Sequence, residues 1–475
     1  MPGLDTSIDT LTETQRAASP SLWWDGLLRP DPEPPLETTI TADYAIVGGG
    51  YTGLWTAYFL KRKQPNADVV LIEAQYIGYG ASGRNGGWLM GTLEGLAAFA
   101  DNKGTLPATA RVQLNTLVSR AGQVLATEGI NCDFHHGGCV MAAARNASQI
   151  ARAHETLAHF QRLGFSEDDY RWLTPKALTA RVQVANPGGA VFTPHVGRVQ
   201  PAKLVTGLAR VVKALGVRVF EHTRANNISP GHIDCDRGSV SANQIVIATE
   251  GYSEVGNPLH RRIIPVQTGM VVTEPLNDEQ WSDIGFHDNE TFADFTRAAT
   301  YLQRTADQRL VIGARGNYLP GGRPQHALAD TTLIAQYRQR IALDLFPQLR
   351  GVRFTHNWGG SVGVPRSWHP HVIYDPFSRI GTAGGYIGEG VGASFLFGET
   401  LAALLTGESS ELSKMPWVQQ RALAELRRWE PEPFPQLGLK ATMLAFDAEE
   451  WLLNRYGESL PARAMGWLCD QLDPH

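Results

Sequence analysis

The segment ADYAIVGGGYTGLWTAYFL, residues 42–60, constrains the fold of this chain more than any other. Its first apolar run has the composition of a buried parallel strand, and the residues after the glycines have the apolar spacing of a helix. A second apolar run, ADVVLIEA at residues 67–74, completes a strand–helix–strand unit. The sequence therefore predicts an α/β fold in which a glycine-rich turn joins the first strand to the first helix.

The glycines of that turn have the spacing of a dinucleotide site. Gly48, Gly50 and Gly53 satisfy the pattern G-x-G-x-x-G. The first permits a tight turn, the second lets the backbone approach a pyrophosphate, and the third lets helix and strand pack closely. Glu73 ends the second strand, where a carboxylate accepts hydrogen bonds from a ribose diol and repels a 2′-phosphate. We therefore expect a dinucleotide other than NADP.

Two further glycine clusters favour FAD over NAD. GYGASGRNGG at residues 78–87 follows closely, as a long ligand requires when its pyrophosphate and rings extend past the first turn. The strand–turn–helix at residues 380–407 contains Gly388 and Gly390, but no second strand with a terminal acid follows it. A second dinucleotide is therefore not expected there. Its helix N-terminus at Gly390–Val391 suits the pyrimidine end of a flavin, whose negative charge backbone N–H groups stabilise.

Composition and charge exclude several other classes of protein. The 475 residues are 43% hydrophobic and 19% charged, which is ordinary globular composition, and the net charge of −5 carries no long basic run for nucleic acid. Four scattered cysteines make a disulfide framework unexpected and favour a reducing compartment. The first twenty residues lack an apolar signal core, and no apolar run reaches the ~18 residues of a membrane span. We expect a cytoplasmic protein without a transmembrane segment.

Cys132 and Cys139 are candidate metal ligands, because His135 and His136 lie between them. No second ligand pair follows, and a pair of strands over CDFHHGGCVMAA is the simpler interpretation, with at most one of the two histidines facing inward. We therefore expect no metal. The Cys-containing segment interrupts residues 88–190, which otherwise show mainly helical patterns.

Six segments together make the chain resemble the D-amino-acid-oxidase-like superfamily of FAD enzymes, which includes glycine oxidase and sarcosine oxidase. It is most similar to the γ-glutamylputrescine oxidase-like branch. The segments, spread over about residues 40–407, are YAIVGGGYTGLWTAYFL, VVLIEAQYIGYGASGRNGG, PAKLVTGLARVVKALGVRVFEHT, IVIATEGY, WGGSVGVPRSWHP and AGGYIGEGVGASFLFGETLA.

The resemblance implies an α/β plus α+β architecture. A Rossmann-like FAD domain would be built from the discontinuous segments 41–98, 191–258 and 351–407. A substrate domain with an antiparallel sheet over the flavin would comprise residues 99–190 and 259–350. Residues 1–40 would form an N-terminal arm anchored by Trp23 and Trp24, and residues 408–475 a helical C-terminal appendage with an amphipathic helix docked on the body.

The resemblance also implies which residues meet the cofactor, with the backbone near Arg224–Ala225 at the adenine and Thr249 in the dinucleotide turn. The predicted cofactor-binding set is Val47, Gly48, Gly50, Tyr51, Thr52, Gly53, Glu73, Ala74, Gly80, Ala81, Ser82, Arg84, Asn85, Gly86, Gly87, Ala225, Thr249, Gly388, Glu389, Gly390 and Val391. Three departures stand out. Glu250 replaces a Gly or Asn that is common in the family. No cysteine lies between Cys235 and Cys469 to tether the flavin, so FAD is expected to be non-covalent. No lysine lies between Lys213 and Lys414 to activate oxygen.

The chemistry implied by the resemblance is oxidation of a C–N bond in an amine or amino acid. Hydride transfer to flavin N5 would give an imine that hydrolyses to a carbonyl and an amine or ammonia, and O2 would be reduced to H2O2. No side-chain acid or base is obligatory, so the catalytic residues are unassigned. Two alternatives remain open: an FAD dehydrogenase that passes electrons to a carrier or quinone, and a flavin-binding protein without turnover.

Substrate contacts are expected from the later strands. Gln267, Tyr301 and Gln303 are the candidates, the last two on one face of TYLQRT with Arg304 on the other. Arg315 or Tyr318 in GARGNY is a further candidate, since an inward arginine suits a carboxylate or phosphonate. His369 and His371 flank a proline, and a surface loop is the expected place for both. Polyamine derivatives, N-methylated amino acids and aminophosphonates are all compatible substrates, and the oligomeric state is open.

Overall fold

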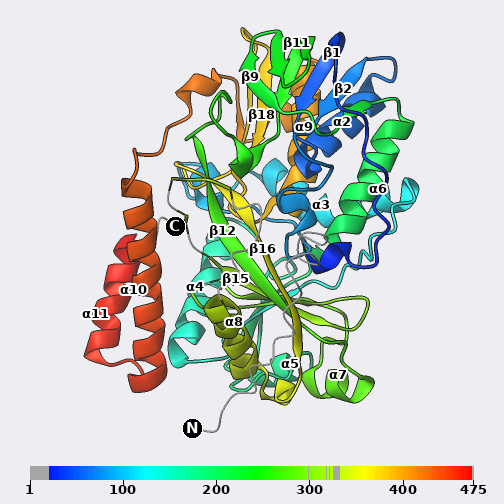
Figure 1. The fold of residues 1–475 in the computed structure, drawn as a ribbon. Coiled ribbons are helices and arrows are strands. Elements are labelled where there is room, and N and C mark those ends of the chain that lie inside the picture. The colour runs from blue at the N-terminus through cyan, green and yellow to red at the C-terminus, as the bar shows by residue number, and fades with distance from the viewer. Residues whose placement is uncertain (1–20, 298, 317, 320, 325–331, 473–475) are drawn as a thin grey trace.

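The structure is a computed structural model that describes residues 21–297, 299–316, 318–319, 321–324 and 332–472. Two large sheets lie one above the other in Figure 1, with a pair of helices, α10 and α11, beside the lower one. The mixed α/β and α+β architecture predicted from the sequence is confirmed, including the helical C-terminal region. Residues 1–20 of the predicted arm lie outside the described residues.

The upper sheet has nine strands and is mainly parallel. In spatial order its strands are β19 (Val418–Gln419), β17 (His371–Asp375), β18 (Ile380–Gly384), β11 (Ser239–Ile247), β1 (Thr39–Val47), β2 (Val69–Ile72) and β8 (Arg218–Phe220), with β9 (Ala225–Ser229) and β10 (His232–Cys235) joined to β11. β1 pairs in parallel with both β2 and β11. The last four residues of β1 and all of β2 are buried, as expected for strands covered on both faces.

The lower sheet has eight strands. In spatial order they are β16 (Phe354–Pro365), β12 (Ile263–Thr273), β15 (Leu310–Arg315), β14 (Tyr301–Arg304), β13 (Thr291–Asp294), β4 (Cys139–Ala142), β6 (Ala190–Thr193) and β5 (Arg171–Leu173). All neighbouring pairs are antiparallel except β13 and β4, which run parallel. A short separate pair is formed by β3 (Trp88–Met90) and β7 (Val196–Arg198).

Helices cover both sheets. They are α2 (Tyr51–Lys63), α3 (Ala108–Thr127), α4 (Ala147–Arg162), α5 (Pro175–Thr179), α6 (Pro201–Ala214), α7 (Asp278–Ile284), α8 (Thr332–Leu345), α9 (Gly390–Leu405), α10 (Phe434–Tyr456) and α11 (Leu460–Leu472). α2 and α9 pack so closely at Gly398 that a Cβ on this residue would lie only 2.7 Å from Cβ of Trp55. Trp55 and Phe395 meet edge to face in the main apolar core at this contact.

The helices α3, α4 and α5 account for most of the regular structure in residues 88–190, as expected, and the short strands β3, β4 and β5 lie in the same range. Two other sequence-based expectations need correction. CDFHHGGCVMAA contains the single strand β4 and not a pair, because the chain before β4 is irregular and only bridges to Arg198 at His135. His135 and His136 are both exposed, which agrees with the expectation that at most one of them faces inward. His371 is not in a surface loop: it opens β17 and is 1% exposed, because β17 pairs with β18 inside the upper sheet.

The described part of the N-terminal arm is anchored by its two tryptophans, as predicted. Trp23 and Trp24 are buried in the turn η1 (Leu22–Trp24). Nε1 of Trp23 donates to the carbonyl of Asn85 at 2.8 Å, and Nε1 of Trp24 donates to the carbonyl of Gly83 at 3.1 Å. The arm therefore holds the second glycine-rich loop in place.

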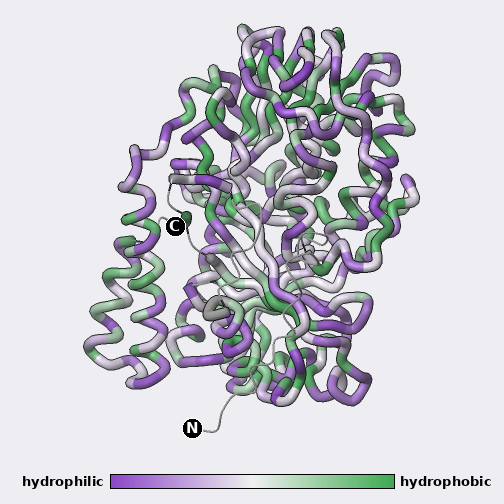
Figure 2. Tube along the Cα trace, in the orientation of Figure 1, coloured by the Kyte–Doolittle hydropathy of each residue, from purple (hydrophilic) through white to green (hydrophobic). Residues whose placement is uncertain are grey.

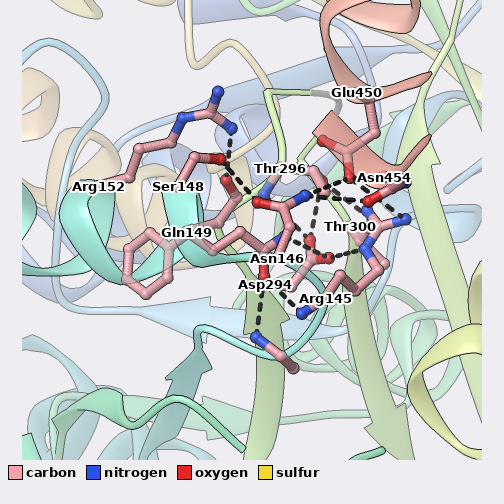
Figure 3. A network of polar contacts seen from close by, with 12 residues as sticks. Arg145, Asn146, Ser148, Gln149, Arg152, Asp294, Thr296, Thr300, Glu450 and Asn454 are labelled. Carbon is pink, nitrogen blue, oxygen red and sulfur yellow. Dashed lines mark hydrogen bonds and ion pairs between the residues drawn. The ribbon is translucent and has the colours of Figure 1, made fainter. Parts of the chain in front are cut away.

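The C-terminal helices attach to the lower sheet through charged side chains. Figure 3 shows Arg145 and Asn146 before α4 meeting Asp294 at the end of β13 and Glu450 of α10. Glu449 of α10 pairs with Arg152 at 2.7 Å. Hydrophilic and hydrophobic residues alternate along α10 and α11 (Figure 2), and their outer faces leave Leu444, Trp451 and Trp467 more than half exposed, among others.

Candidate functional site

A cavity of about 250 Å³ lies at the carboxyl ends of β1, β2 and β11 and reaches the start of α9. This is the edge of a parallel sheet where ligands bind in open α/β folds. Its walls come from seven separate parts of the chain, which lie within residues 47–52, 72–85, 223–226, 248–257, 361–363, 386–391 and at residue 394. The topology thus brings all three predicted glycine clusters to one cavity.

The first turn is shaped so that only glycine fits. Gly48 has a φ of +116°, and a Cβ there would lie 2.5 Å from the carbonyl oxygen of Ala248. A Cβ on Gly53 would lie 2.0 Å from the carbonyl oxygen of Gly48. Gly50 is the N-cap of α2 and offers no side-chain cap. The positive end of the α2 dipole therefore opens onto the cavity, as an anionic phosphate group requires.

Glu73 stands at the end of β2 on the cavity wall. Its carboxylate accepts hydrogen bonds from the backbone N–H of Gly49 at 2.7 Å and of Gln75 at 2.9 Å. Burial raises the pKa of Glu73, although these two hydrogen bonds and the neighbouring Ala74 N–H oppose that shift. The carboxylate is fixed in orientation, and its remaining lone pairs are available to a ribose diol.

The second glycine-rich loop is held by its own side chains as well as by the arm. Asn85 donates to the carbonyls of Ala81 and Ser82 and accepts from the N–H of Gly87. Ser82 Oγ accepts from the N–H of Tyr51 at 2.9 Å, which ties the loop to the start of α2. Arg84 turns away from the cavity: its Nε donates to the carbonyl of Tyr79, and its guanidinium lies over the Tyr79 ring.

The substrate candidates lie beside this loop rather than on the cavity wall. Nε2 of Gln303 donates to the carbonyl of Gly86 at 2.5 Å, and the Tyr301 ring lies so close that a Cβ on Gly86 would be 2.8 Å from it. Both residues thus point to one side of β14, as predicted. Arg304 points away, with its guanidinium over the Trp281 ring.

The remaining candidates from the strands are distributed differently. Nε2 of Gln267 donates to Oγ of Ser361, which lines the cavity. Tyr318 hydrogen-bonds Glu432 and packs in another apolar cluster, away from the cavity. The side chain of Arg315 lies outside the described part of the structure.

Glu250 lies on the cavity wall, although it was not among the predicted cofactor-binding residues. It has a φ of +48°, and its Oε1 accepts from the N–H groups of Gly385 and Tyr386, each at 3.0 Å. Burial raises the pKa of Glu250 to about 7. The carboxyl group therefore links the turn after β11 to the turn after β18, two segments that meet at the cavity.

Most of the predicted cofactor residues line the cavity. Those on the wall are Val47, Gly48, Gly50, Tyr51, Thr52, Glu73, Ala74, Gly80, Ala81, Ser82, Asn85, Ala225, Thr249, Gly388, Gly390 and Val391. Those off the wall are Gly53, Arg84, Gly86, Gly87 and Glu389. Wall residues that the sequence missed include Thr223, Asn226, Glu250, Tyr252, Asn257, Ser361, Gly363, Tyr386 and Ser394. The departure from the family pattern at Glu250 was the one signal among them.

The turn, the carboxylate and the helix terminus define a dinucleotide-binding protein. Residues 43–404 match the family described as DAO, FAD dependent oxidoreductase. The chain belongs to this family, the predicted resemblance is confirmed, and its cofactor is FAD. FAD fits the residues present, because the glycine turn leaves room for a pyrophosphate and the oriented carboxylate of Glu73 has lone pairs that a ribose diol could use.

Individual relatives agree with this assignment. Gamma-glutamylputrescine oxidoreductase of Escherichia coli (strain K12) is 30% identical over 387 residues, which cover 79% of this chain and 86% of that protein. Sarcosine oxidase subunit beta of Rhodobacter capsulatus is 22% identical over 366 residues, covering 71% and 78%. The crystal structure of glycine oxidase from Geobacillus kaustophilus superposes with a TM-score of 0.65 at 19% identity, covering 80% of this chain and 99% of that one. No helix in the described parts of the chain has both the length and the apolarity to span a membrane.

Proposed function

We propose that this protein oxidises the C–N bond of a small amine or amino acid. The chemistry that bound FAD would supply is acceptance at N5 of a hydride from the carbon beside the amine, and the electrons so gained would pass to O2 to give H2O2. Water would hydrolyse the resulting imine to a carbonyl and an amine or ammonia. The observation that carries the proposal is the convergence of three glycine-rich segments on one cavity, next to Tyr301 and Gln303 of the lower sheet.

The residues of this chain would position the reactants and exclude water. Gly48 and Gly50 would hold the pyrophosphate, Glu73 the ribose, and the N-terminus of α9 at Gly390–Val391 the pyrimidine end of the flavin. Tyr301 and Gln303 would cover the reacting face. A substrate amine buried there loses solvation, which lowers its pKa and favours the neutral form that can give up a hydride.

A positive charge lies near Tyr301, the candidate substrate contact. Arg338 of α8 is 4% exposed, and a Cβ on Gly269 would lie 2.8 Å from its guanidinium. Burial lowers the pKa of Arg338, and the adjacent Tyr301 opposes that shift. We therefore expect amines with a carboxylate to be oxidised faster than the same amines without one.

We further propose that FAD is bound without a covalent link. The four cysteines are free, and none of them lines the cavity. The purified protein should be yellow, and acid precipitation should release the flavin into the supernatant. A pellet that stays yellow would contradict the proposal of non-covalent binding.

The test of function is an anaerobic screen in which amines bleach the flavin absorbance. Polyamine derivatives, N-methylated amino acids and aminophosphonates should each be tried with and without a carboxylate. Y301F should slow bleaching, whereas Y318F is the matched control, because Tyr318 packs away from the cavity. Bleaching by no amine would overturn the proposal and leave a flavin-binding protein without turnover.

The electron acceptor is decided by a second arm of the same screen. Peroxide release in air supports an oxidase, whereas dye reduction under nitrogen without peroxide in air supports a dehydrogenase. The dehydrogenase is the second candidate, because no lysine lies between Lys213 and Lys414 to activate oxygen.

A further inference from the structure

A second cavity, separate from the cofactor site, is lined by cationic side chains. It measures about 110 Å³ and shares no wall residue with the first. Arg262 comes from the residue before β12, His371 from the first residue of β17, and Arg421 from the segment after β19. Arg366, Arg427 and His369 also line the cavity, together with one acidic residue, Glu425. Sequence segments around residues 262, 366–371 and 419–427 thus place four arginines on one cavity.

Two of these arginines share one carboxylate, and the other two form no ion pair within the described ranges. Nε of Arg366 donates to both carboxylate oxygens of Glu430 at 3.0 Å, and Arg427 approaches the same carboxylate at 3.6 Å. Within the described ranges, neither Arg262 nor Arg421 forms an ion pair. Arg262 is 7% exposed, and its one hydrogen bond runs from Nη1 to the carbonyl of Leu426 at 3.0 Å. The four arginines and the carboxylates of Glu425 and Glu430 leave a net charge of +2 at the cavity, and Arg428 adds its positive field to Arg262.

Buried polar atoms on the cavity wall also lack partners. Neither ring nitrogen of His371 has a well-formed hydrogen bond, although the carbonyl of His369 slightly favours its charged form. Nε of Arg262, Nε of Arg421 and Oε1 of Gln419 are likewise buried without a partner. Native proteins satisfy nearly all such groups, since each orphan costs about 1–3 kcal/mol. The cluster calls for a ligand that accepts several hydrogen bonds and carries negative charge.

We propose that this cavity binds a small tetrahedral oxyanion of the phosphate class between Arg262, Arg421 and His371. A dianion such as hydrogen phosphate balances the two unpaired guanidinium groups, and its four oxygens accept from donors that converge from three segments. Gln419 accepts the remaining P–O–H proton through Oε1. A neutral His371 donates from one nitrogen: burial and the charges of His369 and Arg421 lower its pKa to about 3, so the imidazole is uncharged near neutral pH.

The cavity has an exposed rim through which such an ion can enter. Ser367, Glu425 and Arg427 are exposed wall residues, whereas His371 closes the inner end. The volume is less than half that of the cofactor cavity, which suits a small ion better than a nucleotide. Inorganic phosphate and the phosphoryl end of a small phosphomonoester share the required chemistry.

The site adjoins the turn that leads to α9. His371 pairs with Gly384 across β17 and β18, and a Cβ on Gly385 would lie 3.2 Å from the His371 ring. Gly385 in turn donates its N–H to Glu250 on the wall of the cofactor cavity. An anion on His371 is therefore in position to stabilise the turn that precedes Gly388.

The test is titration calorimetry of the FAD-loaded protein in a buffer without phosphate. The loaded protein is used because its pyrophosphate turn is filled. Phosphate should bind with one site per chain, R421Q should weaken it at least tenfold, and R421K should retain most of the affinity. R237Q is the matched control, because Arg237 is an exposed cation paired with Glu37 away from this cavity.

Each arm has an outcome that decides the proposal. Tighter binding of glycerol 3-phosphate than of phosphate supports a phosphorylated metabolite as the ligand, and the reverse order supports the free ion. Acetate binding as tightly as phosphate would overturn the assignment to a tetrahedral oxyanion. No heat with either phosphate compound, or equal binding by R421Q and the parent protein, would overturn the site itself. None of these measurements depends on amine oxidation.

Discussion

Two clusters of buried charged side chains in this molecule differ in whether their charges are paired. Where the C-terminal helices attach, Arg145 and Asp294 form an ion pair at 2.7 Å, and side chains from α4 and α10 complete the network in Figure 3. In the second cavity, Arg262 and Arg421 lie beside His371 with no carboxylate paired to them in the described structure. The first cluster connects α4, β13 and α10, whereas the second carries the positive charge on which the proposed anion site depends.

The largest expected effect comes from breaking the paired cluster at Asp294. Its side chain is fully buried, accepts from Nε of Arg145 and accepts from Thr296 Oγ1 at 2.8 Å. D294A leaves Arg145 buried without its partner, so we expect a loss of about 3–5 kcal/mol in the free energy of unfolding. Urea denaturation measures the change.

Replacing both partners separates charge from packing in that cluster. R145M combined with D294L removes the charges together, and we expect it to recover most of the stability lost in D294A. A loss below about 1 kcal/mol in D294A would show that the network contributes no more than a surface pair.

The sequence predicted the nucleotide-binding turn but neither of the two charge clusters. The apolar runs of β1 and β2 and the spacing of Gly48, Gly50 and Gly53 are local features, so the nucleotide turn could be predicted from them. Arg145 and Asp294 lie 149 positions apart, and no local pattern reveals that they meet. The histidines of SWHPHV have the polarity of a surface loop, and only the pairing of β17 with β18 buries His371.

The same limit applies to the candidate site. Glu73 was predictable because its position after β2 follows from the strand–helix–strand unit. Arg84 was expected at the pyrophosphate because of its loop, yet its direction is decided by the Tyr79 ring and carbonyl. Glu250 stood out only as a departure, since its two backbone donors come from residues 385 and 386. The cofactor roles of individual residues remain predictions.

The next largest effect is expected at Glu250, whose buried carboxyl group is paired with no cation among the described residues. Burial raises its pKa from 4.5 to about 7, so the folded protein holds a proton that the unfolded chain releases in that range. The stability of the parent protein should therefore fall as pH rises from 4.5 to 7, and should not fall further above 7 on account of this group. E250Q keeps an acceptor for the N–H groups of Gly385 and Tyr386 and cannot ionise.

The measurement is the free energy of unfolding of the parent and of E250Q between pH 5 and pH 8. We expect the difference between them to shift by about 2 kcal/mol in favour of E250Q as pH rises. Only this slope is diagnostic, because the new amide N–H2 adds a penalty that does not vary with pH. A constant difference across the range would contradict the raised pKa of Glu250.

The smallest expected effect on stability is at an ion pair that has the same separation as Arg145 and Asp294 but is exposed to solvent. Arg353 is 61% exposed and pairs with Glu274 at 2.7 Å, a distance equal to that between Arg145 and Asp294. Water already solvates both charges, so R353Q should change the free energy of unfolding by no more than about 1 kcal/mol, and 1 M salt should remove the difference. The same salt should leave the D294A effect largely intact, because buried charges are screened much less. If R353Q proved as damaging as D294A, distance and not burial would govern these pairs, and the contrast between the paired and unpaired clusters would lose its physical basis.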